Sequence, residues 1–149
     1  MKPPPVSPRV LTDLLARQGY RLTSGRRAIL AVFSASDGPL TVDAVRARLP
    51  PHAADRVTVY RTVHLLVTAG LLRVAGTGRT GVRYGLGEQI AGHHAFLVCQ
   101  QCGRIDTTLG CPLPAGTVTR LRRRLAQAHQ FRLVDHEVRL LGFCRSCHA

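Results

Sequence analysis

Cys99-Gln-Gln-Cys102 and Cys144-Arg-Ser-Cys147 are two matching cysteine pairs in the last third of this 149-residue chain. One C-x-x-C pair can present both sulfurs to an ion, and two pairs complete the tetrahedral thiolate set that structural zinc prefers. The interval between the pairs, residues 103–143, is longer than the roughly 15–20 residues of a compact zinc ribbon. We therefore expect Zn(II) to tie the end of the chain to an earlier strand and to contribute to its folding.

Disulfides and a redox C-x-x-C are the other uses of such cysteines. Residues 1–20 carry no apolar signal-peptide core, so we expect a cytoplasmic protein, whose reducing surroundings disfavour disulfides. A redox pair would not explain why the motif occurs twice. The expected structural zinc ligands are Cys99, Cys102, Cys144 and Cys147.

The charge of the chain indicates a polyanionic partner. The net charge is +13 and the pI is near 11.3, values typical of nucleic-acid-binding proteins. Residues 1–83 hold 13 Lys and Arg against 4 Asp and Glu, whereas residues 84–149 hold 8 against 4. We therefore expect nucleic acid on the first half. No apolar run approaches the roughly 18 residues that span a bilayer, so we expect a soluble protein without a membrane partner.

The first half reads as several short helices. Polar residues at helix starts and glycines or prolines at helix ends mark the boundaries. The expected helices are one after the cap Ser7 that ends at Gly19, one after the cap Thr23, one after the cap Thr41 that Pro50-Pro51 stops, and one from about Asp55 to Ala69, before Gly70.

The fourth helix and the segment after it predict a winged helix-turn-helix. Val59, Val63, Leu66 and Val67 form one inward stripe of the helix. Leu71–Ala75, a glycine-rich turn over residues 76–81, and Val82–Leu86 are typical of a β-hairpin. The charged residues off the stripe could be an ordinary solvated face, but the excess of positive charge favours a helix that enters the major groove. We assign residues 1–86 to this domain.

Residues 87–149 predict a small α/β unit, which gives the whole chain an α+β fold. Ala95–Cys99 and Arg104–Thr108 read as strands that flank the first cysteine pair. A helix is expected within Leu113–Gln130, and the mostly alternating stretch Phe131–Phe143 is expected to be a strand that delivers Cys144. Such units commonly pair through their sheets, so we expect a dimerisation domain.

These segments resemble the ferric uptake regulator family over about residues 10–147. The resemblance is carried by Gly19-Tyr-Arg-Leu-Thr23 with Arg26, by Thr58-Val-Tyr-Arg61, by His93-His94 before Cys99, and by His136 before the last cysteine pair. It implies a homodimeric, metal-responsive bacterial repressor that binds a double-stranded DNA operator. The candidate DNA-contacting residues are Arg26, Arg56, Thr58, Tyr60 and Arg61.

The chain departs from the family pattern at one metal site. Family members usually carry His-His-x-Asp-His before the first cysteine pair, but this chain has His93-His94 followed by Ala95 and Phe96. The histidine expected before the third helix falls at Gly38-Pro39, and the acidic or thiol ligand of the hinge strand falls near Gly85. The resemblance therefore implies that the interdomain sensor site has lost most of its ligands.

The second regulatory site keeps candidate ligands. His93 and His136 stand in matching positions, and His94 and Asp106 are the preferred additional donors, with Glu88, Glu137, Cys111 and His129 also close in sequence. Such a set suits Zn(II) or Fe(II). The alternative interpretation is that these histidines are ordinary polar residues on the surface. For Cys111 we expect a buried or free thiol instead of a ligand.

The leading hypothesis is a metal-dependent transcriptional repressor of zinc or iron uptake or homeostasis genes. A peroxide- or redox-sensing regulator of the same family, or a regulator with a degenerate metal sensor, is the alternative. A zinc hydrolase is disfavoured because the chain has no H-E-x-x-H or comparable spacing. An RNA-binding protein is disfavoured because the few Phe and Tyr residues do not alternate as base stacking requires. We therefore expect no enzymatic activity.

Overall fold

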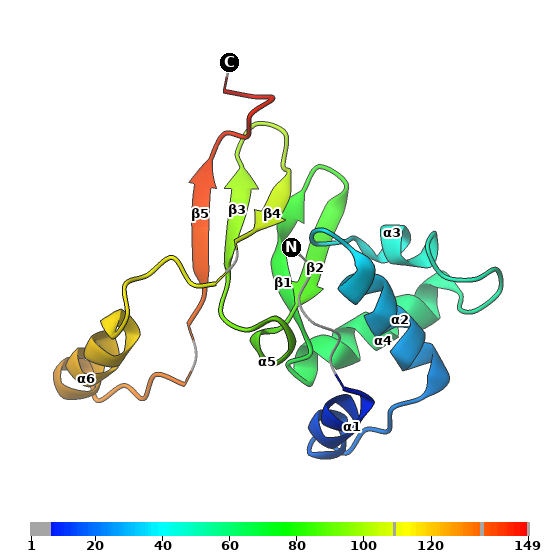
Figure 1. Cartoon of the computed structure of the whole chain (residues 1–149), viewed down its shortest axis with the longest axis horizontal. Helices are drawn as coiled ribbons and strands as arrows, with labels where there is room; N and C mark the ends of the chain where they lie inside the picture. Colours follow the sequence, from blue (N-terminus) through cyan, green and yellow to red (C-terminus); the bar gives the residue numbers. More distant parts are fainter. Residues whose placement is uncertain (1–6, 109, 135, 149) are drawn as a thin grey trace.

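The chain has an α+β fold, in which a helical half with a two-stranded sheet precedes a three-stranded sheet (Figure 1). The computed structural model describes residues 7–108, 110–134 and 136–148. The helices are α1 Pro8–Ala16, α2 Ser24–Ala35, α3 Val42–Arg46, α4 Arg56–Thr68, α5 Glu88–Ala91 and α6 Thr117–His129. The strands are β1 Leu72–Gly78, β2 Gly81–Leu86, β3 Ala95–Cys99, β4 Ile105–Thr107 and β5 Val138–Gly142. Among the described residues, none of the helices combines the length and apolar character that crossing a membrane requires.

The predicted helix starts are confirmed by their capping hydrogen bonds. The side chains of Ser7, Thr23 and Thr41 each accept a backbone N–H from the first turn of α1, α2 and α3. These bonds satisfy donors that the helix itself cannot use. The α-helical part of α3 ends at Arg46, earlier than predicted, because i→i+3 hydrogen bonds tighten the chain into a turn before Pro50.

Glycines end the first and fourth helices as predicted. Gly19 and Gly70 have φ values of +76° and +72°, a left-handed conformation that favours glycine. Directly after Gly70 in the sequence, the N–H of Leu71 donates to the carbonyl of Leu66 at 2.9 Å. This bond turns the chain from α4 directly into β1.

The first core lies among α1–α4 and the two-stranded sheet. Val59, Val63 and Leu66 of α4 are fully buried, as the predicted stripe requires, and Val67 packs at its edge. Leu40 exchanges two backbone hydrogen bonds of 2.8 Å with Tyr84 of β2. This bridge attaches the segment before α3 to the wing formed by β1 and β2.

The wing has longer strands than the sequence predicts. The expected turn covers residues 76–81, but β1 continues through Gly78 and β2 begins at Gly81. A register shift between Val74 and Gly76 marks a β-bulge. At Gly76 a Cβ atom would lie 2.9 Å from the Ile105 side chain, so glycine permits a close approach of β4. Gly76 and Gly78 therefore lie within β1, where they allow close packing, and are not part of a long turn.

The second sheet has the order β4-β3-β5, and β3 pairs with β5 in parallel. β3 is as predicted, and β4 covers the centre of its predicted range. β5 starts at Val138, later than predicted, and Phe131 and Val134 lie exposed in the segment before it. α6 starts at Thr117, lies away from the sheet in Figure 1 and has no buried residue. α5 was not predicted, because one helical turn carries little periodicity.

A second apolar core joins the wing to the three-stranded sheet. Ala75 of β1, Phe96 of β3 and Ile105 of β4 are buried together, and Val98 packs against them. Ile90 of α5 belongs to the first core. The two halves therefore share apolar contacts, and the domain boundary at 86/87 stays a prediction.

Candidate metal centre and nucleic-acid interface

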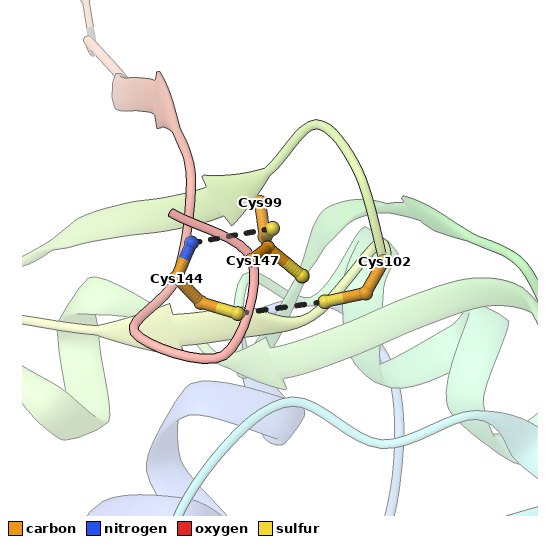
Figure 2. Close-up of side chains that lie close together, drawn as sticks. All are labelled: Cys99, Cys102, Cys144 and Cys147. Carbon is orange, nitrogen blue, oxygen red and sulfur yellow. Dashed lines mark hydrogen bonds between the residues drawn. The ribbon is translucent and has the colours of Figure 1, made fainter. Parts of the chain in front are cut away.

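The four cysteines of the two C-x-x-C pairs converge at the end of the second sheet (Figure 2). Parallel pairing places Cys99 opposite Gly142, so the pair that follows β5 lies beside the pair that follows β3. The four sulfurs all lie within 4.8 Å of one another. Cys102 Sγ and Cys144 Sγ are 3.7 Å apart. A tetrahedral Zn–S₄ centre requires sulfurs about 3.8 Å apart, so this group fits such an ion.

The backbone around the cysteines favours a thiolate. The N–H of Cys144 donates to Cys99 Sγ at 3.3 Å. Hydrogen bonds from the backbone of Cys102 and Cys144 lower the pKa of Cys99 to about 6, whereas the neighbouring Cys144 sulfur and burial raise the pKa of Cys147 to about 12. Several thiolates repel one another in so small a space. A bound dication would remove this repulsion, so the donor chemistry agrees with the geometry.

His93 and His136 meet beside Glu88 at a second site. Their rings stack with centroids 5.0 Å apart, and His93 Nδ1 lies 3.2 Å from Glu88 Oε2. These three residues line a pocket of about 500 Å³ that Cys111 also lines. The structure thus brings together the two histidines that the family pattern pairs, with Glu88 as their acidic neighbour.

The other two candidate regulatory ligands lie elsewhere. His94 is buried, its Nδ1 lies 2.8 Å from the carbonyl of Gly92, and its ring packs edge-on against Phe96. Asp106 pairs with Arg104 at 2.8 Å on β4. Within the described part of the chain, the four cysteines form the one group of three or more potential ligands close enough together to hold a metal ion, so His93, His136 and Glu88 are neighbours that do not form such a group. The expectation that His94 and Asp106 join His93 and His136 does not match this arrangement, because His94 packs against Phe96 and Asp106 pairs with Arg104.

An apolar contact occupies the place where the family pattern has an interdomain metal site. Phe96 is 1% exposed. A Cβ atom on Gly85 would lie 3.4 Å from the Phe96 ring and 3.7 Å from Pro39. Ala95 and Pro39 are also buried. None of these side chains can ligate a metal, so the residues at this position are suited to packing.

The outer face of α4 carries most of the predicted DNA-contacting residues. Thr58, Tyr60 and Arg61 are exposed, whereas the opposite face of the helix is buried. Arg56 is also exposed, and its Nε donates to Asp43 of α3 at 2.7 Å. Arg26 lies on α2, where its guanidinium donates to the carbonyl of Arg21 and sits over the Tyr20 ring.

The exposed face of α4 also carries His64, which the sequence places off the buried stripe, and its ring lies tilted against Tyr60 with centroids 4.3 Å apart. Two residues of these surfaces were not predicted. Val57 is 57% exposed on the same face of α4. Arg73 of β1 donates to Glu88 at 2.7 Å. An arginine between the apolar residues Leu72 and Val74 was the available signal, but only the tertiary structure identifies its partner.

Comparison with known proteins agrees with the fold. The sequence pattern of the Ferric uptake regulator family matches residues 17–141. The ferric uptake regulation protein of Campylobacter jejuni is 27% identical over 138 residues, which is 90% of this chain and 83% of that protein.

Two solved structures share the fold. The Helicobacter pylori ferric uptake regulator Fur superimposes with a TM-score of 0.70 at 19% identity, covering 100% of this chain and 98% of that chain. A zinc uptake regulator complexed with zinc and DNA superimposes with a TM-score of 0.58 at 24% identity, covering 90% and 87%. Since the family pattern spans most of its length, the chain belongs to the Ferric uptake regulator family.

Proposed function

We propose that this chain is a metal-dependent transcriptional repressor that acts in the cytoplasm as a homodimer and binds double-stranded DNA operators of zinc or iron uptake or homeostasis genes. The observation that carries the proposal is the four-cysteine group in a chain of this family, beside a winged helix with an exposed basic face. In this proposal residues 1–86 bind DNA, and residues 87–149 dimerise and bind metal. Catalytic activity is not part of the proposed function.

In this proposal Cys99, Cys102, Cys144 and Cys147 hold structural Zn(II). The ion would supply a cross-link between the turn after β3 and the end of the chain. Both segments are short, and Cys102, Cys144 and Cys147 are only half-buried, so apolar packing alone holds them weakly. Zinc binding at such a site contributes directly to folding.

For DNA we propose contacts from Arg26, Arg56, Thr58, Tyr60 and Arg61. Winged-helix proteins place the helix before the wing in the major groove, and in this chain that helix is α4. The excess of Lys and Arg in residues 1–83 supports this orientation. Arg56 would exchange its exposed contact with Asp43 for a phosphate, since exposed ion pairs are worth little.

For regulation we propose a second Zn(II) or Fe(II) held by His93 and His136, with Glu88 beside them. The 5.0 Å ring stacking and the shared pocket support this choice over a site that includes His94 or Asp106. We propose no metal at the interdomain position, where Phe96, Pro39 and Gly85 stand. Redox sensing is a second candidate, because the free thiol of Cys111 lines the same pocket.

The four-cysteine proposal is tested by metal content and by Cys102→Ser. We expect about one zinc per chain after mild chelation of the wild type. Cys102→Ser leaves an incomplete thiolate shell, so it should lose that zinc, melt at a lower temperature and dimerise more weakly. Cys111→Ser is the matched control, because Cys111 is a free thiol outside the group. A Cys102→Ser protein with unchanged melting and dimer mass would contradict the structural role.

The regulatory proposal is tested by DNA binding with and without a second metal. Wild-type protein that holds one zinc should bind duplex DNA more tightly after addition of Zn(II) or Fe(II), and His136→Ala should abolish this response while it retains the first zinc. Equal DNA affinity of the wild type with and without metal would instead indicate a degenerate sensor. Loss of DNA binding after peroxide treatment, abolished by Cys111→Ser, would favour redox sensing.

A further inference from the structure

Glu88 contacts both halves of the chain. Its Oε1 accepts a hydrogen bond from Arg73 Nη1 at 2.7 Å, and its Oε2 lies 3.2 Å from His93 Nδ1. Arg73 belongs to β1 of the wing, whereas His93 precedes β3. The Arg73 and Glu88 side chains are 17% and 18% exposed, so solvent ions screen this pair less than a surface pair. Glu88 is therefore a direct polar link from the histidine pocket to the wing.

The Glu88 carboxylate lies where it would favour one of the two tautomers of His93. An ionised carboxylate can only accept hydrogen bonds, so for His93 to donate across this 3.2 Å separation the proton must be on Nδ1. The lone pair of a neutral ring then lies on Nε2. Metal-binding histidines commonly donate their second ring N–H to a carboxylate in this way. Glu88 thus orients His93 without needing to be a ligand itself.

We infer that Glu88 is a positioning residue that couples occupancy of the His93–His136 pocket to the wing, with Arg73 as the receiving side chain. The inference rests on the regulatory site proposed above. A metal ion bound to the other ring nitrogen of His93 would make Nδ1 a stronger hydrogen-bond donor and would tighten its contact with Glu88. A tighter contact at Oε2 would fix the Glu88 carboxylate more firmly and, through Oε1, the position of Arg73.

The place of Arg73 in the fold gives this coupling an effect on DNA binding. Arg73 is the second residue of β1, and β1 follows α4 after only Ala69, Gly70 and Leu71. The N–H of Leu71 is bonded to the carbonyl of Leu66 in α4. Restraint of Arg73 therefore restrains the C-terminal end of the proposed DNA-contacting helix. Ala75 holds the same strand by apolar packing against the second sheet.

The experiment compares Arg73→Gln, Glu88→Gln and the wild type, each holding one zinc. Arg104→Gln is the matched control, because Arg104 forms an exposed ion pair with Asp106 away from Glu88. The first measurement is the affinity of the DNA-free protein for a second equivalent of Zn(II), by competition with a chelator. The second is the ratio of DNA affinities with and without that equivalent, on a duplex enriched by the wild type from a random library. Because the ratio compares each variant with itself, the general loss of DNA affinity that follows from removing one positive charge cancels.

We expect the wild type and Arg104→Gln to show a ratio of about 5–150, the usual range of coupling between sites. Arg73→Gln should keep its affinity for the second Zn(II) within about threefold but lose most of this ratio. Glu88→Gln should lose both the ratio and about 10–100-fold of the Zn(II) affinity, because His93 is no longer oriented.

Two results would overturn the coupling alone. The first is that Arg73→Gln keeps the full wild-type ratio of DNA affinities. The second is that the Zn(II) affinity of Arg73→Gln falls as far as that of Glu88→Gln, since Arg73 would then serve only to hold Glu88. If the wild type binds no second Zn(II), or if its DNA affinity does not change when it does, the regulatory site itself is wrong and the coupling is wrong with it. The wild-type measurement thus separates the two failures.

Discussion

Asp55 is the residue that starts α4. Its carboxylate accepts the backbone N–H of Thr58 at 2.6 Å, and this hydrogen bond is the main reason why the pKa of Asp55 lies below its ordinary value. A lowered pKa means that the folded protein favours the ionised carboxylate. The resulting stabilisation is present above the unfolded pKa and is lost as the pH falls through the folded pKa.

We expect Asp55→Ala to lower the unfolding free energy near neutral pH, because Thr58 loses its acceptor. The difference in unfolding free energy between the variant and the wild type should narrow as the pH falls below about 4, because the wild-type carboxylate then becomes protonated. Urea unfolding at several pH values measures this difference. Asp37→Ala is a control at an exposed aspartate that caps no helix. A difference that stays constant with pH would contradict the role of the charged cap.

α4 and α6 are both basic helices, but they differ in their packing. α4 buries one face against the first core and exposes Arg61 on the other. α6 carries Arg123 and has no buried residue. A helix that reads DNA must be held rigidly by its domain, which favours α4 as the DNA-contacting helix.

Arg61→Ala should therefore weaken binding to duplex DNA more than Arg123→Ala does. If Arg61 contacts a base, the loss should be about 1–3 kcal/mol, and if it contacts a phosphate, the salt dependence should become shallower by a slope of about 1. Fluorescence anisotropy at several salt concentrations distinguishes these cases. Equal losses for the two variants would mean that the DNA surface lies elsewhere.

β5 exposes apolar side chains on both faces of the sheet. Leu140 and Leu141 are 45% and 62% exposed, although successive residues of a strand point to opposite faces. β5 is also at the edge of its sheet, so one row of backbone groups is available for pairing. A second copy of the chain would cover these side chains, which supports the proposed homodimer.

Leu141→Glu should raise the dissociation constant of the dimer by at least about tenfold, because a charge would be buried without a partner. Analytical ultracentrifugation across a concentration series measures this change. Val10→Glu is the control, because Val10 is 44% exposed on α1, far along the chain from the second sheet. Unchanged dimerisation of Leu141→Glu would place the dimer interface away from β5.

Across the whole molecule, the contact around Phe96 sets how the two halves meet. The buried core of Ala75, Phe96 and Ile105 needs no metal. Gly76 allows this core to close, because a side chain there would press on Ile105, and Gly85 lies next to the Phe96 ring. We therefore expect the wing to remain packed on the second sheet in metal-free protein.

Phe96→Ala should lower the unfolding free energy by about 3–5 kcal/mol, because it removes a fully buried aromatic side chain. It should also loosen the two halves, which faster proteolysis near residues 87–95 would detect. Phe131→Ala is the control, because Phe131 is 54% exposed. A Phe96→Ala protein with wild-type stability would show that the halves are held together elsewhere.

The sequence by itself determined the features that depend on residues a few positions apart. Ser7, Thr23 and Thr41 cap their own first turns, and the stripe of α4 follows from helical spacing. The cysteine pairs could also be recognised as metal ligands from the sequence, because the two sulfurs of a C-x-x-C turn lie close together. The family resemblance followed from the order of such local motifs.

Tertiary structure alone decided which distant residues meet. Glu88 joins Arg73 and His93, whereas His94 turns away from them despite lying next to His93 in the sequence. Phe96 closes against Gly85 and Pro39 in an apolar contact. These outcomes depend on strand register and on the packing of two sheets, and a shift of one residue in a strand reverses the direction of every side chain. Spacing along the chain carries no such information.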